Sequence, residues 1–585
     1  MSENLTRLFD LPEYQLKHTP QEKAFNTKIG GQWVALSTQE YCHQIDIISN
    51  ALIELGVQPD DKIAVVTEVN SVEWHILDMA LLQIGAVSVP LYATLSLKDY
   101  EFILNHSDSK ICFVSNTDLY KKVQSVQKNT QLISIFSFDN AVCDNNWKSL
   151  IVSGKNKTLQ VEVEERKSKI TQKDLATIIY TSGTTGIPKG VMITHEELLY
   201  TATICKELLN LDAPYLPVLS YLPISHIFER LVMYYYQYMG FQIYFAESLD
   251  KLVDNLQEVK PVFLPIVPRL LEKIFDKIIA KGNELSGVKK AMFFWAVRLA
   301  ESTELDGKRG FHHKIADKLI FSKWRAVFGG HIRFLVSGSA PLQDRLIKIF
   351  TAAGLPVYEG YGMTESSGVI SLNGYRKGQS RLNTVGNLMP GLEAKIAADG
   401  EILIKGPNIL KGYYKNDLET SVVIRDGYFH TGDVGELCKD GFLKITDRKK
   451  EIFKTSGGKY IAPASIENKM KQSSFIEQIM VIGEGRKMPA ALIQVNYEFV
   501  KNWAESRDHT ITDVTTDEKL IAAIQKEINL HNETLGKWES IKKFEITPDE
   551  WTIEAGHLTP TLKPRRKVIK EMYKDLFTKI YANEN

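Results

Sequence analysis

The chain has 585 residues, which exceeds a single compact core and predicts two or more domains. Its composition, 44% hydrophobic and 24% charged, is ordinary for a globular protein. Because 71 lysines and arginines balance 71 aspartates and glutamates, no global field attracts nucleic acid or an anionic membrane, and a nucleic-acid-binding function is not supported.

The cysteines and the N-terminus bear on the cellular compartment. Five cysteines are scattered without CxxC or Cys/His spacing, which argues against a zinc site or a disulfide scaffold. The first residues lack a basic region followed by an apolar core, so we expect no secretory signal. No apolar run reaches about 18 residues, so no membrane span is expected. These features favour a cytoplasmic location for the protein. Peripheral contact of the protein with the inner face of the membrane is left open.

From about residue 60 the chain alternates between strand and helix patterns. Residues 62–66, 87–91 and 111–114 have the pattern of buried strands, and residues 72–84 and 100–104 have helical spacing. Such alternation predicts a parallel sheet covered by helices. A further extended run is expected at residues 132–136.

The polar stretch 155–173 is interpreted as a connection to a second unit that begins with a strand at 176–180. That unit also alternates, and we expect strands at residues 218–222, 242–245, 262–266 and 332–336. Residues 386–445 change to short alternating runs broken by Gly, Pro, Asn and Asp, which predicts a small antiparallel barrel or sheet. The charged stretch 447–451 fits a domain hinge or a solvated turn, and composition does not separate the two.

A loop rich in glycine and hydroxyl groups runs from Tyr180 to Gly190. Glycines let backbone N–H groups approach anionic oxygens, and hydroxyls and a lysine add further donors, so the loop suits a polyphosphate. A surface turn is the alternative interpretation. Gly183 and Lys189 have the spacing of a Walker loop, but Pro188 and Gly190 replace its second glycine and its Ser/Thr. The loop is therefore not the P-loop of an ATPase.

The loop instead resembles the phosphate-binding signature of the adenylate-forming superfamily of acyl-CoA synthetases, luciferases and peptide-synthetase adenylation domains. Four more strings follow in that family's order: VSGSAPL at 336–342, YEGYGMTE at 358–365, GYFHTGD at 427–433 and LTPTLK at 558–563. Each string alone reads as a turn, or as a solvated basic stretch in the case of Lys563 to Lys570. Together they are most similar to long-chain acyl-CoA synthetases, although Leu562 departs from the wider superfamily.

The resemblance implies an α/β fold with two domains. Residues 1–446 are expected to form an N-terminal adenylation domain of two helix-covered sheets plus a small β-barrel. Residues 447–450 would be a hinge with Lys450 as the pivot. Residues 451–585 would form a smaller, mobile α+β domain that carries the catalytic lysine.

The resemblance also implies a nucleotide site. The ring of Tyr361 would hold adenine, Thr364 would touch the α-phosphate, and Asp433 and Arg448 would contact the ribose. A carboxylate suits a vicinal diol because it accepts two charge-assisted hydrogen bonds. The other ATP- or AMP-binding residues implied are Thr181, Ser182, Gly183, Thr184, Thr185, Gly186, Lys189, Gly338, Ser339, Ala340, Glu359, Gly360, Gly362, Met363 and Ile445.

Catalysis is assigned by the same resemblance. Lys563 would be the catalytic lysine, supported by Thr364, Glu365 and His226. Glu365 and Thr184 would bind Mg²⁺, which prefers oxygen ligands and keeps several waters. After domain rotation, the small residues Ser456 and Gly457 would line the coenzyme A tunnel.

The implied reaction is the ATP-dependent activation of a long-chain fatty acid to acyl-AMP, followed by transfer to coenzyme A. The region from Asp317 to Gly330 resembles an insertion of the long-chain branch. Alternatives are an acyl-AMP ligase, a ligase that loads a carrier protein, and a nucleotide- or fatty-acid-binding protein without turnover. Retention of Lys563, Glu365 and Asp433 argues against the last. A monomer and a homodimer both remain open.

Overall fold

The computed structural model describes residues 5–155, 159–182, 187–209, 211, 213–305, 307, 309–376, 378–559 and 563–582. The chain forms two compact units. The larger comprises Met1–Ala340, Asp344–Glu393 and Ile404–Phe429, and the smaller comprises Pro341–Gln343, Ala394–Leu403 and His430–Asn585. The smaller unit thus begins before the predicted hinge, and the hinge at 447–450 stays a prediction.

A seven-stranded sheet with the order β18-β8-β7-β4-β3-β5-β6 organises the first part of the larger unit. Strands β3 to β7 pair in parallel, whereas β8 and β18 are antiparallel to their neighbours. The strands are β3 (Lys62–Thr67), β4 (Val87–Tyr92), β5 (Ile111–Val114), β6 (Ser134–Ser137), β7 (Leu175–Ser182), β8 (Pro188–Thr194) and β18 (Gly412–Tyr413).

The position of strand β7 differs from the one we predicted. We predicted that this strand begins a second unit, but it pairs with β4 in the first sheet. The preceding polar stretch contains helix α7 (Gln160–Lys169), on which Val163 is fully buried. Parallel neighbours need a long crossover connection, and such connections are usually helical. The polar stretch therefore belongs to the crossover into β7 and does not separate two sheets.

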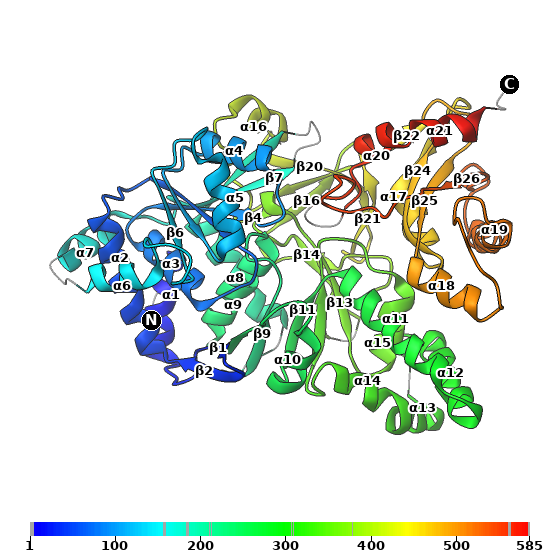
Figure 1. The fold of residues 1–585 in the computed structure, drawn as a ribbon, viewed down its shortest axis with the longest axis horizontal. Helices are drawn as coiled ribbons and strands as arrows, with labels where there is room; N and C mark the ends of the chain where they lie inside the picture. The colour runs from blue at the N-terminus through cyan, green and yellow to red at the C-terminus, as the bar shows by residue number, and fades with distance from the viewer. Residues whose placement is uncertain are drawn as a thin grey trace. The chain divides into compact units, whose positions relative to one another are not determined.

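Alternate residues of β3 explain why helices cover both faces of this sheet. Ile63 and Val65 pack in one core with helices α2 (Thr38–Glu54) and α3 (Val72–Gln83). Ala64 and Val66 pack in a second core with α4 (Leu97–His106) and α5 (Thr117–Gln127). Successive strand side chains point to opposite faces, so a continuous apolar run requires cover on both sides. These helices lie around the sheet in the blue part of Figure 1.

Two more sheets complete the larger unit. One has the order β11-β12-β13-β14-β15, and the other has the order β2-β1-β10-β9. Their strands are β1 (Phe25–Ile29), β2 (Gln32–Leu36), β9 (Pro217–Ser220), β10 (Gln242–Phe245), β11 (Phe263–Ile266), β12 (Phe334–Ser337), β13 (Val357–Tyr361), β14 (Ser371–Leu372) and β15 (Asn387–Leu388).

The segment that resembles an insertion of the long-chain acyl-CoA synthetase branch is also helical. There, α13 (Phe311–Ala316), a π-helical turn (Asp317–Phe321) and α14 (Ser322–Val327) follow one another. The remaining helices are α1 (Leu11–His18), α6 (Trp147–Gly154), α8 (His195–Leu209), α9 (Ile227–Met239), α10 (Leu252–Val259), α11 (Pro268–Glu284), α12 (Gly287–Ser302), α15 (Asp344–Ala352) and α16 (Asp417–Val423).

A small sheet is present in the predicted region 386–445, although β15 and β18 of this region pair with other sheets. Its order is β16-β17-β20-β19, with β21 paired to β20. Strand β20 is antiparallel to both β19 and β21. Its strands are β16 (Glu393–Ile396), β17 (Glu401–Lys405), β19 (Ile424–Arg425), β20 (Tyr428–Leu437) and β21 (Leu443–Arg448).

The smaller unit is built on the three-stranded sheet β24-β25-β26. Ile479 and Val481 of β24 pack with α17 and α19, whereas Met480 and Ile482 pack on the other face with α20 and α21. Figure 1 labels this sheet and these helices in the yellow to red part of the chain. The elements are β22 (Phe453–Lys454), β23 (Tyr460–Ile461), α17 (Pro463–Met470), β24 (Ile476–Ile482), β25 (Ala490–Val495), α18 (Tyr497–Glu505), α19 (Glu518–Asn532), β26 (Phe544–Ile546), α20 (Arg566–Met572) and α21 (Lys574–Tyr581).

None of the helices in the described ranges combines the length and the apolar composition needed to cross a membrane. All five cysteines are free thiols.

Candidate active site

The predicted phosphate loop joins the antiparallel strands β7 and β8. Thr181 lies opposite Lys189, and Ser182 lies opposite Pro188. The hairpin therefore brings Thr181 and Lys189 side by side at the base of the loop. The predicted binding residues Gly183, Thr184, Thr185 and Gly186 lie outside the described residues.

Close packing explains why residue 190 is a glycine. A Cβ atom there would lie 2.8 Å from Cγ2 of Ile178 and 3.1 Å from Cζ of Tyr180. Both neighbours belong to β7, so any larger residue would push the two strands of the hairpin apart. This close approach accounts for the missing Ser/Thr of the Walker pattern.

Lys189 belongs to a cluster that joins the phosphate hairpin to Glu365. Its ammonium forms an ion pair with Glu419 and lies 5.3 Å from the ring centre of Tyr413. The Tyr413 hydroxyl donates a hydrogen bond of 2.9 Å to Oε1 of Glu365. Tyr413 is held next to the hairpin because it pairs with Val191 of β8. Sequence analysis missed both Tyr413 and Glu419 as site residues.

Parallel pairing of β12 with β13 gathers the predicted adenine-site segments. Ser337 lies opposite Glu359, so the segment Gly338 to Ala340, which follows β12, lies at the same edge of the sheet as Glu359 to Tyr361, the end of β13. The carboxyl ends of parallel strands are the usual place for a ligand. Ser339 has a φ of 71°, a left-handed conformation that is uncommon for a residue other than glycine.

Thr364 and Glu365 lie on a 3₁₀ turn, Thr364–Ser366. The fully buried Asn408 supports this turn by donating hydrogen bonds to the carbonyl oxygens of Ser366 (3.0 Å) and Val369 (2.7 Å). Gly362 precedes the turn, and a Cβ there would lie 2.3 Å from the carbonyl oxygen of Gly368. No sequence pattern singled out Asn408, which lies more than forty positions after the turn.

His226 is the N-cap residue of helix α9. Its Nδ1 accepts a hydrogen bond of 3.1 Å from the backbone N–H of Phe228, so Nδ1 carries no proton in this arrangement. The first turn of α9 lies beside both earlier segments: Phe228 lies next to Gly338, and Ile227 lies next to Gly368. The structure thus brings His226 into the neighbourhood of the predicted adenine and catalytic segments.

A buried polar network holds the loop that precedes His226. Asn70 donates hydrogen bonds to the carbonyl oxygen of Leu222 (2.8 Å) and to Oε1 of Glu229 (3.1 Å), which also accepts one from Ser220 (2.5 Å). Burial raises the pKa of Glu229 to about 8. Sequence analysis did not identify this network, because Asn70 is more than 150 positions from the loop.

In the smaller unit, Asp433 and Arg448 lie directly opposite each other on β20 and β21. Nε of Arg448 lies 3.2 Å from Oδ1 of Asp433, whose side chain is 5% exposed, whereas the Arg448 side chain is 52% exposed. Ile445 is opposite Gly435 on the same strand pair. The two predicted ribose contacts therefore come together, with the arginine open to solvent.

The predicted pivot Lys450 lies in a turn that its neighbour Lys449 anchors. Lys449 pairs with Asp399 (2.5 Å) and Glu401 (2.9 Å), and hydrogen bonds to these carboxylates raise the pKa of Lys449. Lys450 itself is exposed. The turn is therefore fixed at residue 449.

Ser456 and Gly457 are exposed in the turn between β22 and β23. A Cβ at Gly457 would have only Oγ1 of Thr455 near it, at 3.9 Å. The fold alone therefore gives no packing reason for glycine here.

Lys563 is exposed beside α20, after residues 560–562, which lie outside the described ranges. The backbone N–H of Thr559 donates to the carbonyl oxygen of Lys563 at 2.8 Å, and the N–H of Lys563 donates to Oγ1 of Thr559 at 3.1 Å. These two contacts hold Thr559 and Lys563 together.

Comparison with known proteins identifies the family. The AMP-binding enzyme family matches residues 12–414, and the AMP-binding enzyme C-terminal domain matches residues 450–585. The chain belongs to the AMP-binding enzyme family.

Among the relatives of this AMP-binding enzyme is the long-chain-fatty-acid–CoA ligase FadD15 of Mycobacterium bovis, 32% identical, with 97% of this chain and 95% of that protein covered. The human long-chain-fatty-acid–CoA ligase 1 is 30% identical, with 94% and 82% covered. The adenylation domain of the carboxylate reductase from Mycobacterium chelonae has a TM-score of 0.77 at 22% identity, with 100% and 92% covered. These matches confirm the predicted family and the α/β fold with a smaller C-terminal part.

Glu365 is the carboxylate to consider for the Mg²⁺ that AMP-binding enzymes generally require. Among the described residues, no three His, Cys, Asp or Glu side chains form a metal-binding cluster. Magnesium does not need one, because it usually retains waters and takes one or two carboxylates plus phosphate oxygens. A single glutamate next to the phosphate hairpin therefore fits the ion.

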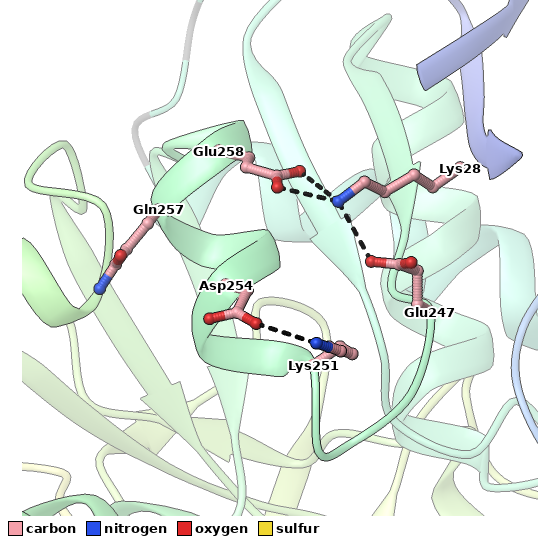
Figure 2. A pocket seen from close by; sticks show the side chains of 6 residues that line it. All are labelled: Lys28, Glu247, Lys251, Asp254, Gln257 and Glu258. Carbon is pink, nitrogen blue, oxygen red and sulfur yellow. Dashed lines mark hydrogen bonds and ion pairs between the residues drawn. The ribbon is translucent and has the colours of Figure 1, made fainter. Parts of the chain in front are cut away.

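A separate polar pocket is lined by Lys28, Glu247, Lys251, Asp254, Gln257 and Glu258 (Figure 2). Lys28 contacts Glu258 at 2.7 Å and Glu247 at 3.2 Å, and Lys251 lies 3.5 Å from Asp254. Its charged groups are thus paired with one another, and none of the predicted site residues lines it.

Proposed function

We propose that this AMP-binding enzyme is an AMP-forming long-chain fatty acid–CoA ligase. The observation that carries the proposal is the cluster of Lys189, Tyr413 and Glu365 beside the phosphate hairpin, in a chain similar over nearly its whole length to long-chain-fatty-acid–CoA ligases. The acyl specificity rests on the names of those relatives.

In the first half-reaction, the fatty acid carboxylate attacks the α-phosphorus of ATP and pyrophosphate leaves. Two anions must approach each other, so catalysis consists of positioning and electrostatic stabilisation. Lys563 would bridge the carboxylate and the α-phosphate, and Thr364 would hold an α-phosphate oxygen. The hairpin with Lys189 would bind the leaving pyrophosphate. When bound, Mg²⁺ would neutralise phosphate charge, with Glu365 and Thr184 as its protein ligands.

Asp433 and Arg448 would hold the ribose. The buried carboxylate of Asp433 suits the ribose hydroxyls because it accepts hydrogen bonds, and it pairs with the half-exposed side chain of Arg448. The other predicted nucleotide contacts, from Gly338 to Ala340 and from Glu359 to Met363, would surround the adenine.

In the second half-reaction, the thiol of coenzyme A attacks the acyl carbon and expels AMP. We propose that residues 451–585 rotate about the hinge at 447–450 between the two halves, with Lys450 as the pivot, and that Ser456 and Gly457 then face the pantetheine arm. The open space at Gly457 supports this assignment. We place the protein in the cytoplasm, where its free thiols would stay reduced.

The test measures both half-reactions separately. Pyrophosphate release should require ATP, Mg²⁺ and a long-chain fatty acid, and thioester should require free coenzyme A. Lys563→Ala should lower acyl-AMP formation by about 100-fold or more, because a charge that stabilises the transition state is lost. Thioester formation from supplied acyl-AMP should largely survive, and Lys567→Ala, an exposed neighbour, should change neither. Equal loss of both half-reactions, or better turnover of acetate than of long-chain acids, would contradict the proposal.

A further inference from the structure

The chain on either side of Lys563 is held by backbone contacts. Leu558 and Pro564 form an isolated antiparallel bridge, and the backbone N–H of Arg565 donates to the carbonyl oxygen of His557 at 2.8 Å. His557 is buried, and its Nε2 lies 3.0 Å from the hydroxyl of Tyr573. The segment that precedes Lys563 is therefore tied to the core of the smaller unit.

Arg566 anchors the chain on the C-terminal side of Lys563, three positions further on. Its guanidinium donates to Oε1 of Glu467 at 2.6 Å and to the carbonyl oxygen of Val481. The backbone N–H of Val481 donates to the same Oε1 of Glu467 at 2.7 Å, which closes a ring of three contacts. The side chains of Arg566 and Glu467 are only 22% and 12% exposed. Arg566 therefore anchors the chain through partly buried contacts. The basic sequence around it instead predicts a solvated residue.

Glu467 also connects this anchor to the strand that carries Arg448. Glu467 lies on α17, and at the start of that helix the backbone N–H of Ala464 donates to Oδ2 of Asp447 at 3.0 Å. Asp447 directly precedes Arg448 on β21. A continuous series of contacts within the smaller unit thus joins the end of β21 to α17, and α17 to the first residue of α20.

We propose that Arg566, held by Glu467, is a positioning residue for Lys563. A lysine side chain is long and flexible, so the placement of its ammonium depends on how firmly its backbone is held. The forked guanidinium binds a carboxylate and a carbonyl at once and fixes the start of α20 in one orientation. Lys563 then moves with β21 as one body when the domain rotates. This inference rests on the proposed function.

The experiment uses the full chain and compares Arg566→Met, Arg566→Lys, Glu467→Gln and the control Lys567→Met. Loss of the anchor should lower the rate of acyl-AMP formation by about 10- to 100-fold, since a displacement of about 1 Å has effects of that size. Thioester formation from supplied acyl-AMP, which does not use Lys563, should stay within about twofold of the parent rate. Arg566→Lys should recover part of the loss, and the double variant Arg566→Met/Glu467→Gln should lose little more than either single variant.

A purely structural role predicts a different result. It would lower both half-reactions together, in proportion to the loss of folded protein, and that outcome would overturn the inference. Unchanged acyl-AMP formation in both Arg566→Met and Glu467→Gln would also overturn it. If Arg566→Met does not fold, the nearly isosteric Glu467→Gln decides. A normal Lys563→Ala variant would refute the proposed function instead, so the two failures are distinguishable.

Discussion

The Tyr413 hydroxyl donates a 2.9 Å hydrogen bond to Oε1 of Glu365, while the Lys189 ammonium lies 5.3 Å from the centre of the same tyrosine ring. Burial and the neighbouring carboxylate raise the pKa of Tyr413, so the phenol stays protonated and remains a donor. The ring thus sets the distance between a basic and an acidic group that would both face the phosphates of ATP.

Tyr413→Phe should weaken Mg²⁺-dependent adenylation without removing the aromatic spacer. We expect about a 10-fold fall in the rate of acyl-AMP formation and a rise in the Mg²⁺ concentration needed for half-maximal rate, because Glu365 loses a charge-assisted hydrogen bond. Pyrophosphate release over a Mg²⁺ titration measures both. Tyr414→Phe is the control, since its hydroxyl contacts Asp108 at 3.2 Å. An unchanged Mg²⁺ dependence in Tyr413→Phe would refute the role.

Asp433→Ala should raise KM for ATP by about 10- to 100-fold, as expected for the loss of hydrogen bonds to a charged group. It should also abolish the preference for ATP over 3′-deoxy-ATP, because that preference requires a group that reads the ribose hydroxyls. Steady-state kinetics with both nucleotides measure the effect. Glu436→Ala, on the same strand and paired with Lys444 at 2.9 Å, is the matched control. A retained preference for ATP would argue that Asp433 is only structural.

Gly457→Ala should leave the unfolding midpoint unchanged, because a Cβ there meets open space. If the turn lines the coenzyme A tunnel, the added methyl group should raise KM for coenzyme A several-fold and leave acyl-AMP formation unaffected. Gly310→Ala, at a glycine with nothing within 4 Å of its Cβ position, should change neither quantity. An unaltered KM for coenzyme A would remove Gly457 from the tunnel.

Glu229→Gln should reduce the loss of stability at alkaline pH. Burial raises the folded-state pKa of Glu229 from 4.5 to about 8, so the carboxyl favours the folded state fully below pH 4.5, and this contribution is lost as the pH rises to about 8. Glutamine does not titrate and can accept the same hydrogen bonds from Asn70 and Ser220. The unfolding midpoint of the variant should therefore fall less between pH 6 and about 8.5 than that of the parent chain. Equal slopes for both proteins, with Glu436→Gln as an exposed control, would contradict the expectation.

Some features could be predicted from the sequence because they depend on local order along the chain. The apolar runs that became β3, β4 and β5 and the helical spacing that became α3 and α4 are patterns within a few residues. The strings around Lys189, Glu365, Asp433 and Lys563 identified the family in the same way. Tyr413, Glu419 and Asn408 could not be assigned, because they act on residues 39 to more than 200 positions away.

The sequence by itself thus determined the fold class, the family and the residue types available for catalysis. Only the tertiary structure decided which of them are neighbours. In the structure, β7 lies in the first sheet, and Lys189, Tyr413 and Glu365 lie together in one cluster. Arg566, which in the sequence is one residue of a basic stretch, pairs with Glu467. The physical reason is that strand pairing and core packing bring distant residues together. A hydrophobic periodicity over a few residues does not specify those contacts.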